Sequence, residues 1–403
     1  MAVADGCADS EHGSDQARGG GLPGSVIERP VDGSYQVGLP DSPAFFPLGV
    51  WLPTVVDPGQ VAVDRGFGLN VYVGLAHDDD AQLDAIEESG MHLLVQADEW
   101  FGDPRADARA IDGWLVHDEA DMTYGPGWDE WTGTPGWNTC IPPQDDGGGC
   151  GYTVMQQHAD RVPDDALRYA NYGLGVLHFE TDTEAEVFVN HGFQDVVSAD
   201  DYAFTRPDVP ASDRTGASYG RTVERLRHLD GLDGRRQPVW AVVETGHPFS
   251  EDTAPTITAP QLRSAVWHSL IAGARGIVYF DHSFGGRCPT SSVLRSRCDL
   301  EVSRMVTALN SQITELAPVL NAPFVDGYVV ADGPVDVMAK RGPDGAWYVF
   351  AAAITHDGGD VGFRVAAGST VEVVGEEREV TMRGTRFVDT FADGNAVHIY
   401  RVT

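Results

Sequence analysis

Two glutamates in this sequence each end an apolar run, a position that suits acid–base or nucleophilic chemistry. Glu119 ends GWLVHDE at 113–119, and Glu244 ends VWAVVE at 239–244. A carboxyl group at the end of an apolar run is expected to lose part of its solvation, which raises its pKa and favours a general acid. Burying a carboxylate is costly unless it is paired, so such a placement usually serves a purpose.

The distance between these two carboxyl groups would decide which reaction they support. Carboxylates about 5–5.5 Å apart suit retaining glycoside hydrolysis, in which one protonates the leaving oxygen and the other attacks the anomeric carbon. A gap of roughly 6.5–9.5 Å admits a water molecule and inverts the product. The sequence leaves the distance open, so an inverting enzyme that uses Glu119 with another acid, such as Glu180, is an alternative.

Apolar runs alternate with helix-like stretches between residues 45 and 320. Most of the runs are continuous, as expected for strands buried on both faces. The expected strands are 45–53, 68–75, 92–98, 112–119, 174–180, 195–204, 238–246 and 276–284, and the expected helices include 78–90, 165–173, 219–231, 258–274 and 300–320. This alternation predicts an α/β fold, a (β/α)₈ TIM barrel, whose active site lies at the carboxyl ends of the strands. A doubly wound sheet is disfavoured because no Gly-rich phosphate loop follows the first strand.

The composition changes after the barrel. Short strands with turns such as GPDG and ADGN between them predict a small all-β sandwich over 325–403. The barrel then covers 25–324, and the polar, Gly-rich residues 1–24 are expected to be disordered. We expect the segment 25–39 either to pair with the sandwich as a strand or to cover the barrel.

Three segments resemble the retaining (β/α)₈-barrel glycoside hydrolases of clan A. They are GWLVHDEADM (113–122), VWAVVETG (239–246) and AVWHSLIAGARGIVYFDHSF (265–284), and the resemblance extends over 45–323. It implies a glycosidase in which a Glu ending the fourth strand is the acid/base and a Glu ending the seventh is the nucleophile. By this resemblance Glu119 is the acid/base and Glu244 the nucleophile.

The resemblance also assigns Tyr202 a hydrogen bond to the nucleophile. Three positions depart from the clan pattern: Asp118 stands where Asn is usual, the second strand lacks a terminal Arg, and Phe280-Asp281-His282 replaces a terminal Trp. The segments therefore identify no particular family. The alternative from another class is a catalytically degenerate barrel that only binds carbohydrate.

Other strand ends, and the long insert after the fourth strand, carry side chains suited to binding a sugar. Tryptophans on a Gly/Pro-rich loop can stack on the apolar face of a sugar ring. The expected substrate contacts are Trp51, Asp98, His117, Asp118, Trp128, Trp131, Glu180, Tyr202, His247, Asp281 and His282. The histidines show no HxH or HExxH spacing, so we expect no metal and no cofactor.

Four of the five cysteines form two local pairs of equal spacing. Cys140 with Cys150 and Cys288 with Cys298 are expected to form disulfides that close surface loops, the alternative being free thiols. Disulfides imply an oxidising compartment, so we expect a secreted or cell-surface protein. No apolar signal segment precedes Cys7, which suggests an excised leader, and Cys7 would then be a candidate site for a lipid anchor.

The charge balance excludes several partners. The chain has 403 residues, of which 27 are basic and 61 acidic, giving a formal net charge of −34. Nucleic acid and anionic membrane surfaces are disfavoured because both require a basic face. No apolar run reaches the ~20 residues of a transmembrane helix. A neutral carbohydrate is the expected partner, and the sequence leaves the oligomeric state open.

Overall fold

The computed structural model describes residues 24–77, 82–107, 110–123, 151–178, 182–190, 192–251 and 253–403. The expectations for Trp128, Trp131, Cys140, Cys150 and Glu180, and for almost all of the segment 1–24, lie outside these residues.

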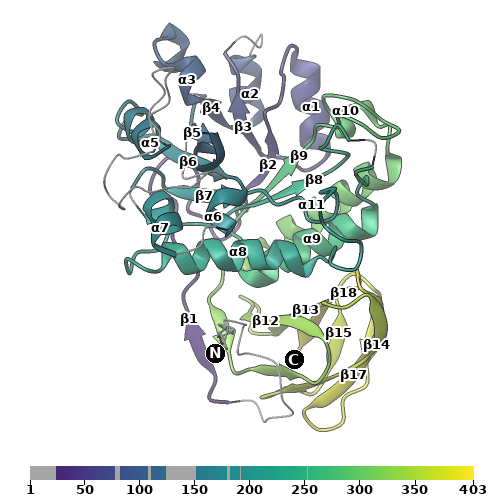
Figure 1. The fold of residues 1–403 in the computed structure, drawn as a ribbon. Coiled ribbons are helices and arrows are strands. Elements are labelled where there is room, and N and C mark those ends of the chain that lie inside the picture. Colours follow the sequence, from purple (N-terminus) through teal and green to yellow (C-terminus); the bar gives the residue numbers. More distant parts are fainter. Residues whose placement is uncertain are drawn as a thin grey trace, which may run out of the picture.

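Eight parallel strands form a nearly closed barrel, which confirms the expected fold class (Figure 1). The sheet order is β7-β6-β5-β4-β3-β2-β9-β8, and an isolated bridge between Val197 and Val239 links its two edges. The strands are β2 (Leu48–Trp51), β3 (Val71–Leu75), β4 (His92–Gln96), β5 (Gly113–Asp118), β6 (Leu167–Tyr172), β7 (Val196–Ala199), β8 (Ala241–Glu244) and β9 (Ile277–Phe280).

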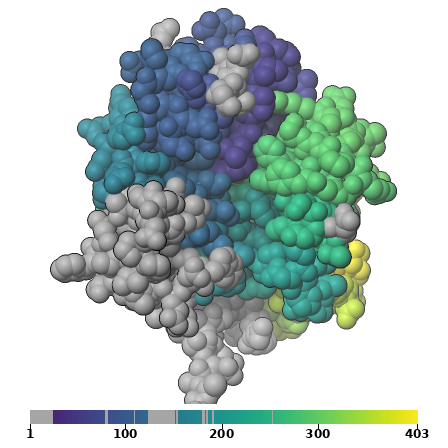
Figure 2. Space-filling model, turned by 45° about the horizontal axis from the view of Figure 1, so that its top comes forward, coloured from purple at the N-terminus to yellow at the C-terminus, as the bar shows by residue number. Residues whose placement is uncertain are grey.

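Helices surround the barrel. The longer ones are α1 (Pro58–Gly66), α2 (Leu83–Ser89), α5 (Gly151–Ala159), α7 (Asp182–Asn190), α8 (Ala217–Asp230), α9 (Ala259–Ala272) and α11 (Leu300–Leu320). Short helices α3 (Ala97–Trp100), α4 (Ala120–Thr123), α6 (Leu174–His178) and α10 (Val293–Ser296) follow strand ends. In Figure 2 the purple and blue first part of the chain and the green residues near 300 occupy opposite sides of one face.

The fifth barrel strand differs from the expectation. Residues 165–173 were expected to be helical, but they contain β6, which pairs with β5 and β7; the expected strand 174–180 instead contains helix α6. In β6, Leu167 and Tyr169 face the barrel interior while Ala170 and Tyr172 pack against the helices, so apolar residues occur on both faces and obscure the period of two. As a result, Asn171 lies near the end of the fifth strand.

The (β/α)₈ barrel is followed by a β domain, as expected. One sheet has the order β1-β10-β12-β13-β18-β15-β16 and the other β11-β14-β17, and a second hydrophobic core contains side chains from both sheets. The strands are β1 (Ile27–Arg29), β10 (Phe324–Asp326), β11 (Val329–Ala331), β12 (Val335–Arg341), β13 (Trp347–Ala353), β14 (Asp357–Val365), β15 (Val371–Val373), β16 (Arg378–Val380), β17 (Arg386–Asp393) and β18 (Val397–Val402). Because β1 pairs with β10, the start of the segment 25–39 joins the β domain rather than covering the barrel.

The rest of that segment closes the amino-terminal end of the barrel. Tyr35 and Leu39 belong to the interior core, and the Tyr35 hydroxyl donates to the Arg275 carbonyl at 2.9 Å while accepting from Trp240 Nε1 at 2.9 Å. Gly38, at φ +74°, passes so close to the start of β5 that a Cβ would lie 2.3 Å from the Asp112 carbonyl oxygen. Side chains of this segment therefore fill the amino-terminal end of the barrel interior.

Helix α9 joins the barrel to the β domain. Trp267 stacks on Phe350 with ring centroids 5.7 Å apart, and His268 contacts Asp336 Oδ2 at 3.0 Å and the Ala353 carbonyl at 2.9 Å.

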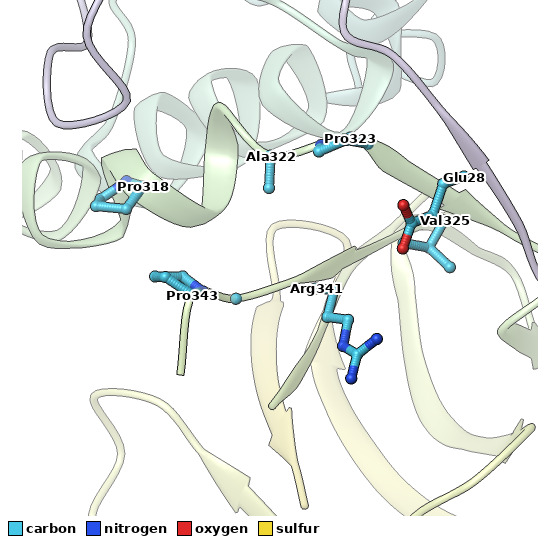
Figure 3. Close-up of a pocket in the computed structure, with 8 residues that line it drawn as sticks. Glu28, Pro318, Ala322, Pro323, Val325, Arg341 and Pro343 are labelled. Atoms are coloured by element: carbon cyan, nitrogen blue, oxygen red, sulfur yellow. The ribbon is translucent and has the colours of Figure 1, made fainter. Parts of the chain in front are cut away.

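A cavity of about 240 Å³ lies between the end of α11 and strands β1 and β12 (Figure 3). Its lining is mostly proline and aliphatic, and it contains neither Glu119 nor Glu244. Among the described residues, no helix is both long and apolar enough to cross a membrane.

Candidate active site

The carboxyl ends of four barrel strands bring polar side chains into the interior. Side chains alternate in direction along a strand, so the residue two positions after an interior apolar residue also faces inward. On β6 Asn171 follows Tyr169 in this way, and on β8 Glu244 follows Val242. On β5 the register shifts between Leu115 and His117, which places Asp118 beside Asn171.

Asn171 connects two carboxyl groups across neighbouring strands. Its Nδ2 donates to Asp118 Oδ1 at 3.0 Å and to Asp200 Oδ1 at 3.2 Å, so these two oxygens lie within the sum of those distances, 6.2 Å. Ser198 donates to Asn171 Oδ1 at 2.6 Å, which turns the amide nitrogen toward the acids. Burial raises the pKa of Asp118 to about 7 and also raises that of Asp200, which the charge of Glu119 raises further. Both groups are therefore partly protonated near neutral pH.

Glu119 occupies the rim of this interior. Its amide donates to the Asn171 carbonyl at 2.9 Å, and its carboxyl group lies against Gly173, where a Cβ would be only 2.9 Å from Oε1. Burial raises the pKa of the half-buried Glu119 to about 7, with further contributions from the charges of Asp118 and Asp121. A carboxyl group that is still protonated near neutral pH can act as a general acid.

Several residues that follow these strand ends have a positive φ, which strains the backbone of a non-glycine residue. Among the described residues, the non-glycine residues with positive φ include Leu52 (41°), Glu119 (50°) and Tyr202 (46°), which follow β2, β5 and β7. Such conformations cost about 1–3 kcal/mol each and cluster at functional sites.

Glu244 is enclosed by hydrogen-bond donors. It has no exposed surface, and it accepts from Tyr219 at 2.7 Å and 2.8 Å on its two oxygens and from Thr205 Oγ1 at 2.9 Å on Oε1. Burial raises the pKa of Glu244 to about 7, and the hydrogen bond from Tyr219 acts in the opposite direction. These donors fix the orientation of the carboxyl group.

The tyrosine that contacts Glu244 is not the expected one. Tyr219, on helix α8, makes the hydrogen bonds that the resemblance assigned to Tyr202, while the Tyr202 side chain bonds to Asp200. Tyr202 also packs on Phe280, with ring centroids 5.2 Å apart, and edge-on against Phe249 at 6.1 Å. Tyr202 thus belongs to an aromatic cluster with Phe249 and Phe280. The resemblance placed this tyrosine at the end of the sixth barrel strand, as Tyr202, whereas the residue that contacts Glu244 is on helix α8.

Asp281 and His247, both expected to contact substrate, form hydrogen bonds within the protein instead. Asp281 accepts from Thr245, from Ser292 and from the Leu294 amide, at 2.9, 2.5 and 3.1 Å. His247 contacts Thr256 Oγ1 at 3.1 Å and the Glu251 carbonyl at 3.3 Å. Both side chains therefore anchor the loops after β8 and β9.

The other expected contacts divide between the interior and the periphery. Trp51 is buried and packs edge-on against Tyr169, and His282 packs against Phe280 with centroids 5.3 Å apart. His117 instead stacks on His158 of α5, and Asp98 lies in the first turn of α3. No group of three His, Cys, Asp or Glu side chains within the described ranges is arranged to hold a metal ion.

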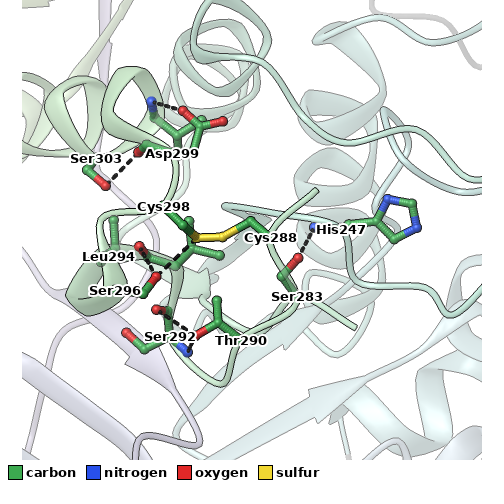
Figure 4. Close-up of a disulfide and its surroundings, with 12 residues drawn as sticks. His247, Ser283, Cys288, Thr290, Ser292, Leu294, Ser296, Cys298, Asp299 and Ser303 are labelled. Atoms are coloured by element: carbon green, nitrogen blue, oxygen red, sulfur yellow. Dashed lines mark hydrogen bonds between the residues drawn. A yellow bond between two sulfur atoms is a disulfide. The ribbon is translucent and has the colours of Figure 1, made fainter. Parts of the chain in front are cut away.

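A disulfide closes the loop after β9. Cys288 and Cys298 are bonded, with Cα atoms 6.0 Å apart, and Thr290, inside the ring, forms an antiparallel bridge with Ser283, which precedes it (Figure 4). This confirms the second of the two expected cysteine pairs.

Replacing both Cys288 and Cys298 by serine is expected to lower the free energy of unfolding by about 3 kcal/mol, because the open loop gains entropy in the unfolded chain. Urea unfolding measures this change, and Cys7→Ser is the control. Alkylation of Cys288 and Cys298 in the untreated native protein, seen by mass spectrometry, would contradict the bond.

Comparison with known proteins supports the fold. No protein-family model matches the chain, and no curated protein matches it. A solved structure described as a glycoside hydrolase is 13% identical, with a TM-score of 0.52, and the match covers 93% of this chain and 96% of the other. A catalytic mutant of Gan42B, a GH42 beta-galactosidase from G. stearothermophilus, is 9% identical, with a TM-score of 0.57, and the match covers 93% of this chain and 99% of the other. A glycoside hydrolase family 5 protein from Bacteroides vulgatus is 12% identical, with a TM-score of 0.51, and the match covers 89% of this chain and 88% of the other. At these identities the chain shares its overall fold with glycoside hydrolases.

Proposed function

We propose that this protein is a glycoside hydrolase that cleaves a polysaccharide or oligosaccharide with net retention. The observation that carries the proposal is the pair Glu119 and Glu244, at the ends of the fourth and seventh barrel strands, whose pKa values are both raised to about 7. With both pKa values near 7, each carboxyl group is available in its acid and its ionised form near neutral pH, and the retaining mechanism uses one group in each form. The shared fold of known glycoside hydrolases supports this choice.

The two glutamates take different roles because their surroundings differ. Glu119, at the rim, protonates the glycosidic oxygen as the C–O bond breaks, and Glu244 attacks the anomeric carbon to form a glycosyl-enzyme ester. In the second step Glu119 takes a proton from water, which attacks the same carbon and releases Glu244. Because Glu244 has no exposed surface, side chains that cover it must move before a sugar can reach its carboxyl group.

The remaining polar groups are assigned to the sugar hydroxyls. Asp118, Asp200 and Asn171 offer donors and acceptors at the barrel interior, and Trp51, Tyr202 and His282 offer ring faces or edges. The tryptophans Trp128 and Trp131 belong to the insert after β5 and are proposed to complete the site. A neutral substrate suits this acidic interior, and the Cys288–Cys298 bond supports secretion or cell-surface exposure.

An inverting hydrolase is the second candidate. It is favoured by the complete enclosure of Glu244 and by the half-buried Asp200, which is close enough to Glu119 for the charge of Glu119 to raise its pKa. In that case Glu119 would protonate the leaving group while Asp200 activates a water.

Proton NMR of the first-formed sugar separates the candidates. We expect aryl glycosides and cell-wall polysaccharides to include a substrate, and its product to appear first with the anomeric configuration of the bond that was cleaved. The Glu119→Gln/Glu244→Gln double variant is the control for contaminating activity. A first product with the inverted configuration would assign the inverting mechanism. Binding of glycans without any turnover would support the alternative of a catalytically degenerate, carbohydrate-binding barrel.

A further inference from the structure

Aromatic side chains alternate along the segment that leaves the last barrel strand. Residues 280–284 have the sequence FDHSF, so Phe280, His282 and Phe284 occupy every second position. In an extended segment such residues point the same way. The ring centroid of Phe280 lies 5.3 Å from that of His282 and 6.1 Å from that of Phe284, and the His282 and Phe284 rings are parallel within 7° at 6.1 Å. The three rings therefore form one aromatic strip that continues outward from β9.

The inner end of this aromatic strip lies beside the acids of the candidate active site. The Phe280 ring is 5.2 Å from the ring of Tyr202, whose side chain bonds to Asp200, and the charge of Glu119 acts on Asp200. At the outer end Phe284 is 59% exposed, and no other Phe, Tyr or Trp among the described residues is as exposed. The strip thus leads from the acids to the solvent.

The backbone holds Phe284 in this exposed position. Its amide donates to the His247 carbonyl at 2.8 Å, and the Ser283 hydroxyl accepts from the His247 amide at 3.3 Å (Figure 4). The Cys288–Cys298 disulfide closes the loop that follows. A ring presented on a fixed backbone loses little freedom when it binds a partner, so binding through Phe284 costs little entropy.

His282, which stacks on Phe284, has an unmet hydrogen bond. Burial lowers the pKa of His282, although hydrogen bonds to the Trp51 and Leu52 carbonyls oppose this effect. Its Nε2 is buried and has no hydrogen-bond partner within the part of the chain that the structure describes. A neutral imidazole that donates through Nδ1 accepts through Nε2. A ligand with hydroxyl groups beside Phe284 would supply the missing donor, whereas a purely apolar ligand would not.

We propose that Phe284 is a sugar-binding platform at the rim of the site, and that it holds a unit of the substrate chain beyond the unit whose bond is cleaved. The apolar CH face of a sugar ring stacks on an aromatic ring while the sugar hydroxyls reach polar groups such as His282. The inference rests on the proposed function, because it takes the neighbouring acids as the place of cleavage. It narrows the substrate class to saccharide chains, in preference to glycosides of a single sugar.

Phe284→Ala tests the inference, with Phe284→Tyr and Val388→Ala as controls. Val388, on β17 in the β domain, is 58% exposed, so its truncation removes exposed apolar surface far from this strip in the fold. Each change is made in the Glu119→Gln/Glu244→Gln double variant, and cello-, xylo- and manno-oligosaccharides and their monosaccharides are titrated into it and followed by NMR. We expect Phe284→Ala to weaken binding of a chain about 10-fold more than binding of its monosaccharide, the size of one aromatic contact. Both control variants should keep the parent's ratio of affinities.

The outcomes separate this inference from the proposed function. An unchanged ratio in the folded Phe284→Ala variant, or no binding of any chain by the parent, would overturn the platform even in an active glycosidase. Chain binding that depends on Phe284, in a wild-type protein that hydrolyses no glycoside, would support the platform and refute the proposed function. A dimer that Phe284→Ala dissociates, seen by analytical ultracentrifugation, would assign the exposed ring to contact between two copies of the chain and overturn the platform.

Discussion

Replacing Glu119 by glutamine is expected to lower turnover at least 10²-fold on substrates with poor leaving groups, since general acid catalysis contributes roughly 10²–10⁴-fold. The amide has nearly the shape of the acid but no transferable proton. Aryl glycosides with activated leaving groups need little protonation, so the first step should be much less impaired with them. Steady-state kinetics on a series of leaving groups measures the difference, and Glu315→Gln, an exposed residue on α11, is the control for the change in charge.

The same variant should change the pH profile in a definite direction. Burial raises the pKa of Glu119 to about 7, so its acid form is complete well below pH 7 and is lost as the pH rises through that value. The wild-type kcat/KM should therefore fall on the alkaline side with a midpoint near pH 7. That limb should be absent from Glu119→Gln, because an amide does not titrate. An alkaline limb identical to that of the wild type would assign it to another group.

Removing the Glu244 carboxyl group should be still more damaging. With Glu244→Gly we expect at least about a 10³-fold loss, the scale reached when a catalytic nucleophile is removed. The truncated side chain leaves space near the anomeric carbon, so added azide should restore turnover by attacking that carbon directly. Because only one displacement then occurs, the glycosyl azide should have the inverted configuration.

The stereochemistry of the rescued product is the decisive measurement. Proton NMR identifies the anomer of the glycosyl azide, and Asp201→Gly is a suitable comparison because Asp201 is also a partly buried acid, paired with Arg206. Near-normal turnover of Glu244→Gly without azide, or rescue of Asp201→Gly alone, would refute the assignment of Glu244.

The sequence was sufficient to locate most of the barrel because continuous apolar runs are typical of strands buried on both faces. The two glutamates were found for the same reason, since each ends such a run on β5 or β8. The fifth strand was missed because LRYANY mixes apolar and polar residues, and its apolar residues serve both the interior and the helix-facing core. Its polar residue Asn171 was missed with it.

The contacts within the site depend on tertiary structure that the sequence pattern does not contain. Asp200 and Asp201 are adjacent in the sequence and identical in type, so only the fold distinguishes Asp200, which contacts Asn171, from Asp201, which pairs with Arg206. Tyr219 lies in the first turn of α8, where the sequence pattern indicates only a residue that packs in the core. Only the packing of α8 beside the end of β7 brings its hydroxyl to Glu244.

Tyr35 and Leu39 pack in the core at the amino-terminal end of the barrel, so side chains fill that end. A sugar held by the described residues at the carboxyl ends of the strands would therefore have to arrive and leave on that side. In the proposed two-step hydrolysis, the departing alcohol and the incoming water would therefore pass the same strand ends one after the other.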